Sequence, residues 1–225
     1  MKTPLSPSDL AALIEYQLLK PEASLLDVEK ACAEARKHGF HSVSVHGSRV
    51  SQAAAFLDES TVKVATVVGF PLGAMDPDAK RYETEVAIDN GAQEINAVLN
   101  IGSLKDGDDS AILRELRDIV EAADERPVGV ILEMPLLTQP DLMRACHLVT
   151  EAGAKSVISS SGFSSGTPTN QDIKLLRDLV GGTFGVTASG KILDAPTALA
   201  LIEAGATRLG TMAGWAIMGQ AAETR

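Results

Sequence analysis

The segment AGAKSVIS, residues 152–159, joins the end of one amphipathic helix to the start of an apolar strand. The same order of helix end, glycine and apolar strand recurs as HGFHSVSV at 38–45, NGAQEINAV at 90–98 and AGATRLGT at 204–211. A glycine after the last helical turn supplies a left-handed cap, and short Val/Ile-rich runs between helices are typical of parallel strands. The repeat therefore predicts alternating helices and parallel strands.

Three further apolar runs lie between these segments: VKVATVVGF from residue 62, VGVILEM from residue 128 and FGVTAS from residue 184. The glycines at 39, 91, 153 and 205 divide the chain so that one strand-plus-helix unit takes roughly 26–31 residues. A strand near residues 13–19 completes a set of eight. Eight units in 225 residues predict a single (β/α)8 TIM barrel of the α/β class, with residues 1–225 as one domain. A doubly wound sheet would usually carry a glycine-rich dinucleotide fingerprint, which this sequence lacks.

The composition is typical of a globular protein and argues against several classes of partner. A net charge of −10, spread along the chain, opposes binding to nucleic-acid phosphates. No apolar run approaches the ~20 residues that span a bilayer, and the N-terminus lacks a signal-peptide pattern. We therefore expect a cytoplasmic protein that contacts neither nucleic acid nor membrane. A homo-oligomer is compatible with the sequence.

The two cysteines give no indication of a metal site. Cys32 and Cys146 are isolated within predicted helices, without a CxxC pair or a histidine at ligand spacing. They are predicted to be buried thiols. The sequence predicts neither a metal nor a cofactor.

Phrases near the predicted strand ends occur together in one known family. LLKPEAS at 18–24, VATVVGFPLGA at 64–74, NGAQEINAVLNIGSLKDGD at 90–108, VILEMPLLT at 130–138, SGFSSGTPT at 161–169, ASG at 188–190 and IEAGATRLGT at 202–211 stand in the family's order. Along nearly its whole length the chain resembles the 2-deoxyribose-5-phosphate aldolase family. The resemblance implies a class I aldolase barrel, in which one lysine forms a Schiff base with an aldehyde while a second lysine and an aspartate move protons.

The resemblance also places the three catalytic positions, and all three hold other residues. Ile158 stands at the position of the Schiff-base lysine, Thr187 at that of the second lysine and Asn96 at that of the aspartate. An amide cannot act as a general base. We therefore expect a divergent member that lacks the family's catalytic residues.

The phosphate site implied by the resemblance is changed as well. Gly162, Gly190 and Gly210 match the family, and backbone N–H groups of such loops can hold an anion. A family glycine is Lys191 here, and a family serine is Met212. We expect a less polar pocket for a small-molecule substrate, with Lys191 available as a cation for a phosphate or carboxylate or as a relocated nucleophile. Trp215 either lines this pocket or packs between helices.

Side-chain alternation along the strands predicts which residues face the barrel interior. With the three catalytic positions taken as inward, the predicted polar residues are His46, Asn96, Asn100, Glu133, Ser160, Thr187 and Ser189. Glu133 and His46 are the members suited to proton transfer. The competing interpretation is that Glu133 is inherited scaffold that binds loop N–H groups, and that His46 replaces a family asparagine without a catalytic role.

Three functions remain open from the sequence. The first is a divergent enzyme that uses imine-free acid–base chemistry, through Glu133 and His46, on a small carbonyl or phosphorylated compound. The second is a non-catalytic binding or regulatory barrel. The third is a deoxyribose-phosphate aldolase, a lyase, that uses a relocated lysine such as Lys191. Kinship at the level of the fold does not decide among them.

Overall fold

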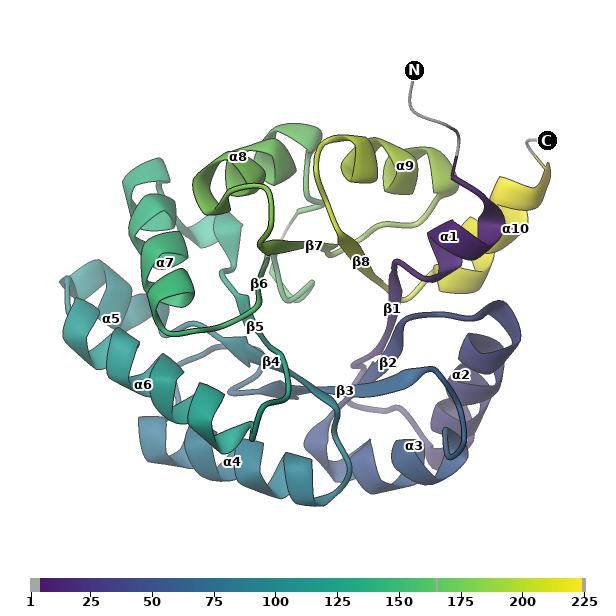
Figure 1. Cartoon of the computed structure of the whole chain (residues 1–225), viewed down its shortest axis with the longest axis horizontal. Helices are drawn as coiled ribbons and strands as arrows, with labels where there is room; N and C mark the ends of the chain where they lie inside the picture. The colour runs from purple at the N-terminus through teal and green to yellow at the C-terminus, as the bar shows by residue number, and fades with distance from the viewer. Residues whose placement is uncertain (1–4, 165, 224–225) are drawn as a thin grey trace.

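The computed structural model describes residues 5–164 and 166–223, and in this part of the chain eight parallel strands close into a barrel in chain order. The predicted (β/α)8 fold is confirmed, as the ring of strands in Figure 1 shows. The strands are β1 (Ile14–Leu18), β2 (Ser42–Val45), β3 (Lys63–Val68), β4 (Glu94–Val98), β5 (Val128–Ile131), β6 (Ser156–Ile158), β7 (Gly185–Ser189) and β8 (Arg208–Thr211).

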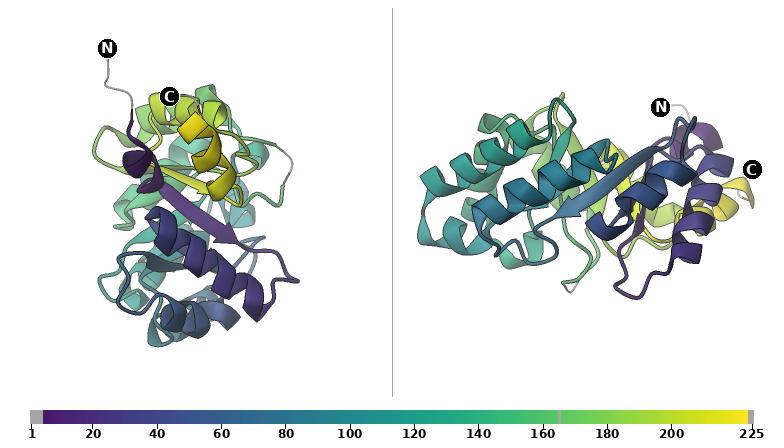
Figure 2. Two further views of the ribbon diagram at one scale, coloured as in Figure 1. Left: turned by 90° about the vertical axis from the view of Figure 1, so that its right-hand side faces the viewer. Right: turned by 90° about the horizontal axis from the view of Figure 1, so that it is seen from below.

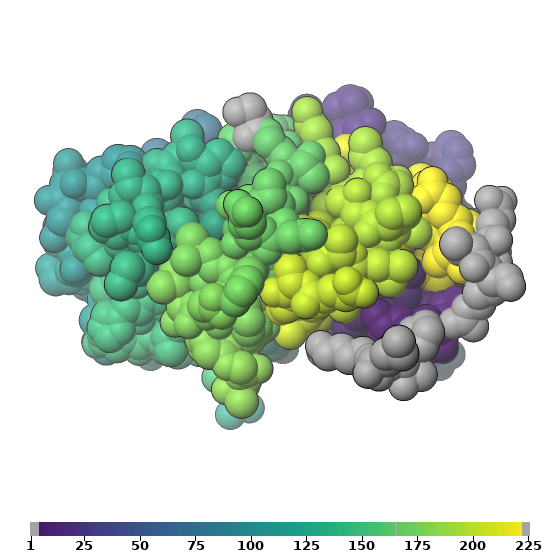
Figure 3. All heavy atoms as spheres, turned by 90° about the horizontal axis from the view of Figure 1, so that it is seen from above, coloured from purple at the N-terminus to yellow at the C-terminus, as the bar shows by residue number. Residues whose placement is uncertain are grey.

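The helices form an outer layer around the strands, seen from two sides in Figure 2. Figure 3 shows the molecule from above the view of Figure 1. On this face the colours run across the surface from teal through green to yellow, in the order of the chain. The helices are α1 (Pro7–Ala11), α2 (Leu25–His38), α3 (Val50–Phe56), α4 (Pro77–Asp89), α5 (Ile101–Asp106), α6 (Asp109–Ala122), α7 (Gln139–Glu151), α8 (Asn170–Val180), α9 (Ala195–Glu203) and α10 (Gly214–Glu223), with 3-10 turns η1 (Gly47–Arg49) and η2 (Met134–Leu136).

The apolar core lies between the strands and the helices. Val43, Ile95 and Val157 alternate with inward residues of their strands and are fully buried in one cluster with helix residues such as Leu116 and Ile119. The barrel interior receives the other set of strand residues, and many of these are polar. Its buried polar residues include Glu15, Ser42, Ser44, Asn96, Thr187 and Ser189. Most of the apolar core thus lies between the strands and the helices, while the barrel interior holds these polar residues together with a small apolar cluster of Val98, Ile131 and Ile158.

Most βα loops end in a side-chain cap that begins the next helix. Ser24, Thr138 and Thr169 each form a capping box with an aspartate three residues later. Single caps at Asp76, Asn100 and Asp194 begin α4, α5 and α9. Each cap satisfies an N–H group that the helix leaves unpaired, so the end of the loop is fixed at the C-terminal face of the barrel.

The structure agrees with the expected thiols. Cys32 and Cys146 are free and buried, and burial raises their pKa values to about 11 and about 12. Within the described residues, no group of three or more His, Cys, Asp or Glu side chains is arranged to hold a metal ion. In the same part of the chain, no helix is both long enough and apolar enough to cross a membrane.

Candidate active site at the barrel mouth

A cavity of about 300 Å³ opens beyond the C-terminal ends of β6, β7, β8 and β1, and we call it the mouth pocket. In barrels of this fold, the chemistry is carried out at this face. The pocket is lined by Gln17, Leu19, Lys20, Ser161, Gly162, Phe163, Gly190, Lys191, Leu193 and Met212. It therefore brings together four predicted site residues, Gly162, Gly190, Lys191 and Met212, with residues that the sequence analysis did not select.

Beneath this pocket, a buried acid occupies the barrel interior. The Asn96 Nδ2 lies 3.2 Å from both carboxyl oxygens of Glu15. Because β1 and β4 are not neighbours in the sheet, this contact spans the interior. Glu15 is 1 % exposed, and burial raises its pKa. The interior therefore favours a neutral carboxyl group next to an amide.

Glu15 and Gln17 are functional candidates that the sequence analysis missed. Alternation along residues 14–18 would have found them, since it places both side chains on the inward face of β1. Gln17 Nε2 donates to Glu15 Oε1 and to Ser189 Oγ, both at 3.1 Å. Gly210 makes room for this amide, because a Cβ there would lie 2.5 Å from Gln17 Nε2. Gln17 therefore connects the buried acid to the floor of the mouth pocket.

Ile158 lies in an apolar cluster on the other side of the interior. It is 2 % exposed and packs with Val98 and Ile131, and Phe70 covers this cluster. Thr187 is its partner in the register between β6 and β7 and is also buried. The environment of Ile158 is that of a core residue.

Glu133 follows β5 in the left-handed backbone region, with φ of 54°. Its carboxylate accepts hydrogen bonds from Ser160 Oγ at 2.7 Å, from the Ser161 N–H at 3.2 Å and from Ser164 Oγ. These three donors belong to the segment that follows β6. Glu133 thus holds the β6–α8 loop in place, as its scaffold interpretation expects.

His46 stands at the end of β2, beside the mouth pocket. Its Nε2 lies 3.0 Å from the Leu19 carbonyl oxygen, and a carbonyl only accepts, so Nε2 carries the hydrogen. In the neutral ring, Nδ1 is then the unprotonated nitrogen. The ring meets Phe70 edge-on, with centroids 5.7 Å apart, and Phe70 in turn meets Phe163. No hydrogen bond or ion pair joins His46 to Glu133 among the described residues, and the two side chains bind different loops.

Two other predicted site residues, Asn100 and Trp215, have structural roles: one caps a helix and the other packs against the core. Asn100 caps α5, where its Oδ1 accepts from the Ser103 N–H at 3.2 Å. The Trp215 ring packs on Tyr16, with centroids 4.7 Å apart, and Tyr16 belongs to the core between strands and helices. Trp215 therefore follows the helix-packing alternative and does not line the mouth pocket.

The lysines near the barrel differ in environment. Lys20 and Lys191 are exposed at the mouth pocket, and neither forms an ion pair in the part of the chain that the structure describes. Lys80 is fully buried in α4, with Nζ 2.7 Å from Glu115 Oε1 and 3.0 Å from the Val98 carbonyl oxygen. Lys80 thus joins α4 to α6 and β4 and does not reach the mouth pocket.

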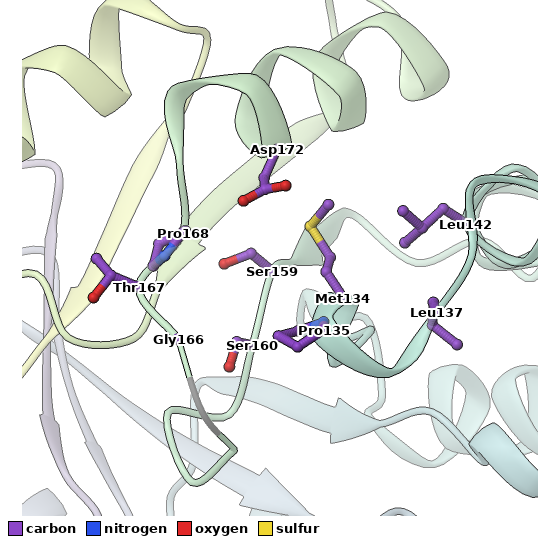
Figure 4. A pocket seen from close by; sticks show the side chains of 10 residues that line it. All are labelled: Met134, Pro135, Leu137, Leu142, Ser159, Ser160, Gly166, Thr167, Pro168 and Asp172. Carbon is purple, nitrogen blue, oxygen red and sulfur yellow. The ribbon is translucent and has the colours of Figure 1, made fainter.

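A second cavity, also of about 300 Å³, lies between the β5–α7 and β6–α8 loops (Figure 4). Met134, Ser159 and Asp172 lie close together on one side of it, with Leu137 and Leu142 on the other. Asp172 is already used by the capping box of α8, and Ser159 Oγ donates to the Ser189 carbonyl oxygen at 3.0 Å. The polar groups of this cavity therefore serve the loops around it.

Comparison with known proteins identifies the family. Residues 6–154 match the model of the DeoC/LacD family aldolase, which covers more than half of the chain. The chain belongs to this aldolase family. It is 49 % identical over 211 residues to a deoxyribose-phosphate aldolase of Alkaliphilus oremlandii, covering 93 % of this chain and 95 % of the relative. It is 48 % identical over 209 residues to the deoxyribose-phosphate aldolase of Bdellovibrio bacteriovorus, covering 93 % and 95 %.

Solved structures of the family share the fold of this aldolase-family chain. The tetrameric deoxyribose phosphate aldolase from Aeropyrum pernix superposes with a TM-score of 0.91 at 29 % identity, over 98 % of this chain and 94 % of that one. The structure described as QR15, an aldolase, superposes with a TM-score of 0.92 at 32 % identity, over 96 % of both chains. Membership of the family and the fold therefore agree.

Proposed function

We propose that this member of the aldolase family is a divergent enzyme that performs acid–base chemistry on a small carbonyl or phosphorylated compound without a Schiff base. The observation that carries the proposal is the environment of Ile158. At the position where the family resemblance implies the imine-forming lysine, an isoleucine packs against Val98 and Ile131 with 2 % exposure. The other two implied catalytic positions hold Asn96 and Thr187, which cannot replace an aspartate and a lysine in proton transfer.

The lysines at the mouth pocket support the same proposal. An imine-forming lysine is usually activated by desolvation or by a neighbouring cation. Lys20 and Lys191 are both exposed. Lys191 remains the basis of a second candidate, an aldolase with a relocated nucleophile, because its side chain lines the pocket.

In the proposed reaction, His46 is the general base and Glu133 is a positioning residue. The unprotonated Nδ1 of His46 would take a proton from the carbon next to the substrate carbonyl, and the C–H electron pair would form an enolate. The Ser161 hydroxyl is suited to stabilise the enolate oxygen, because its Oγ accepts from the Phe163 N–H at 3.1 Å and its own hydrogen is left to donate. Return of the proton to carbon restores the carbonyl compound. Glu133 would hold the loop that carries Ser161.

Reductive trapping tests the absence of an imine. Borohydride reduction with acetaldehyde or deoxyribose 5-phosphate should leave the protein mass unchanged, because Ile158 cannot form a Schiff base. The measurement is intact-protein mass spectrometry, with the Lys191→Gln variant treated in parallel. A stable adduct that disappears in Lys191→Gln would refute the proposal and establish the relocated-lysine aldolase.

We also propose a cytoplasmic homo-oligomer. The support is the tetramer described for the Aeropyrum pernix relative, which shares the fold of this chain. Light scattering coupled to gel filtration would give the mass in solution. A monomer across the micromolar range would contradict self-association.

A further inference from the structure

The mouth pocket combines a polar floor with apolar walls. At the floor lie Gln17, on the inward face of β1, and Ser161, which is 5 % exposed. The walls are Phe163, Leu193 and Met212, which are 55 %, 59 % and 46 % exposed despite being large and apolar. Three such side chains around one opening form an exposed apolar surface of the kind found at ligand-binding pockets.

Three backbone amides of the surrounding loops have partners inside the protein. The Gly162 N–H donates to Ser160 Oγ at 3.1 Å and the Phe163 N–H to Ser161 Oγ at 3.1 Å. The Gly190 N–H lies 3.4 Å from the Gly210 carbonyl oxygen. These three amides are therefore not turned toward a ligand, whereas a phosphate dianion is normally held by several converging N–H groups.

Among the described residues that line the pocket, the two lysines are exposed at its rim. Lys20 follows β1 and Lys191 follows β7, so two ammonium groups approach the opening from different loops. Both are exposed, and within the described residues neither is paired with a carboxylate. Solvated point charges of this kind suit an anionic group at the opening. Because the three amides named above are already paired, we favour a single carboxylate over a phosphate dianion.

From this order of floor, walls and rim, we propose that the mouth pocket binds an oxo-carboxylate whose carbonyl and carboxylate are separated by an apolar chain. The carbonyl oxygen would meet the Ser161 hydroxyl, the chain would contact Phe163, Leu193 and Met212, and the carboxylate would lie between Lys20 and Lys191. This inference rests on the proposed function, since it names the substrate class for the same site.

Isothermal titration calorimetry on the full chain tests the ligand class. The probe is 7-oxooctanoate, compared with 4-oxopentanoate (shorter chain), octanoate (no oxo group), 2-octanone (no carboxylate) and deoxyribose 5-phosphate. We expect 7-oxooctanoate to bind at least about tenfold more tightly than 4-oxopentanoate, because the extra methylenes are buried. Each of the other probes should bind more weakly than 7-oxooctanoate. Tighter binding of deoxyribose 5-phosphate, or no preference for the longer chain, would overturn the proposal.

Two pairs of matched variants locate the binding site. Met212→Ser should weaken 7-oxooctanoate about threefold to tenfold, whereas Met143→Ser, at an exposed methionine of α7, should leave it unchanged. Lys191→Gln should weaken the carboxylate probes about threefold while leaving 2-octanone unchanged. Lys155→Gln, at an exposed lysine of the opposite face, is its control. Equal effects of a variant and its control would place the ligand elsewhere.

The proposed function has a separate readout in the same samples. Proton NMR in D2O follows enzyme-dependent exchange of the protons next to the carbonyl of 7-oxooctanoate. Binding with the expected preferences but without exchange would leave the ligand class intact and refute the acid–base enzyme. Exchange without the chain-length preference would support the acid–base enzyme and refute the proposed ligand class.

Discussion

At the residue scale, Ile158 is buried in an apolar part of the barrel interior. Its side chain contacts Val98 and Ile131 in the interior, and a Cβ on Gly129 would approach its Cδ1 to 3.0 Å. An ammonium group placed there would have apolar neighbours and no carboxylate within the cluster. A lysine at this position therefore requires the surrounding residues to change with it.

Replacing this residue gives the first prediction. Ile158→Lys should lower the free energy of unfolding by several kcal/mol, on the order of the cost of an unpaired buried charge. It should show no aldolase turnover of deoxyribose 5-phosphate, because Asn96 and Thr187 are still unchanged and catalytic groups act as a unit. Chemical denaturation and a coupled aldolase assay measure the two effects. Ile158→Met, which nearly conserves volume, should cost less than about 1.5 kcal/mol. Substantial turnover in Ile158→Lys would contradict our description of the site.

Glu133 gives the second prediction. Glu133→Gln should lower the free energy of unfolding by about 1–3 kcal/mol, because one of the buried serine donors or the Ser161 N–H loses its acceptor. The exchange rate of 7-oxooctanoate protons should change less than tenfold well below the melting temperature. Glu125→Gln, at an exposed glutamate that also has positive φ, should stay within about 0.5 kcal/mol. A roughly 100-fold loss of exchange with unchanged stability would instead make Glu133 a general acid or base.

At the scale of elements, Lys80 connects α4 to α6 and to the end of β4. Gly69 accommodates its stem, since a Cβ there would lie 2.8 Å from the Lys80 Cε. The Gly69 N–H also donates to Glu83 of α4, at 2.8 Å. The Lys80–Glu115 ion pair therefore joins α4 to α6, and the Glu83 carboxylate holds the β3–α4 connection at Gly69.

The third prediction concerns this ion pair. Lys80→Met should lower the free energy of unfolding by about 3–5 kcal/mol, because Glu115 would be left buried and unpaired. The double variant Lys80→Met with Glu115→Leu should recover most of that loss. Urea denaturation of both variants and of Lys30→Met, an exposed control on α2, supplies the comparison. A double variant no more stable than the single one would show that the ion pair is not the source of the effect.

The elements could be predicted from the sequence because their signals are local. Glycines at 39, 91, 153 and 205 stand at helix ends in the structure, and Val/Ile-rich runs at 62–70 and 128–134 contain β3 and β5.

The site could be predicted only in part. The inward residues expected from alternation lie on the strands of Asn96, Ile158 and Thr187 and on those of His46 and Glu133, but none lies on the first strand, so Glu15 and Gln17 were missed. Partners that depend on loop conformation, such as the three donors to Glu133 or the Leu19 carbonyl beside His46, have no periodic signal in the sequence.

For the molecule as a whole, two buried acids of the barrel, Glu94 and Glu15, have different partners. Glu94, at the start of β4, lies 2.7 Å from His41 Nε2, 2.6 Å from Arg208 Nη1 and 3.4 Å from Lys63 Nζ. Burial acts to raise the pKa of Glu94, but the His41 hydrogen bond and the nearby positive charges outweigh it and lower this pKa. Burial raises the pKa of Glu15, which lies further inside the barrel. The protein therefore shifts the pKa values of these two acids in opposite directions.

The fourth prediction uses the titration of Glu15. Because the folded state raises this pKa, folding favours the protonated acid, and its contribution to stability is lost as pH rises from the ordinary glutamate range through the raised value. Glu15→Gln removes this loss, so its stability relative to the parent protein should increase as pH rises above the ordinary glutamate range. Denaturation at several pH values measures the difference, with the exposed Glu22→Gln as control. A difference that is flat or that falls with pH would show that Glu15 is ionised in the folded state.

The caps at the C-terminal face have a consequence for how this barrel can diverge. Ser24, Thr169 and Asp194 begin the helices that follow three of the loops around the mouth pocket. Since each cap is complete within a few residues, the helix start does not depend on the preceding loop sequence. Mutations that alter ligand preference can then accumulate in the loops while the strands and helices of the barrel keep their positions. The barrel is modular in this sense, and selection can act on binding and on folding almost independently.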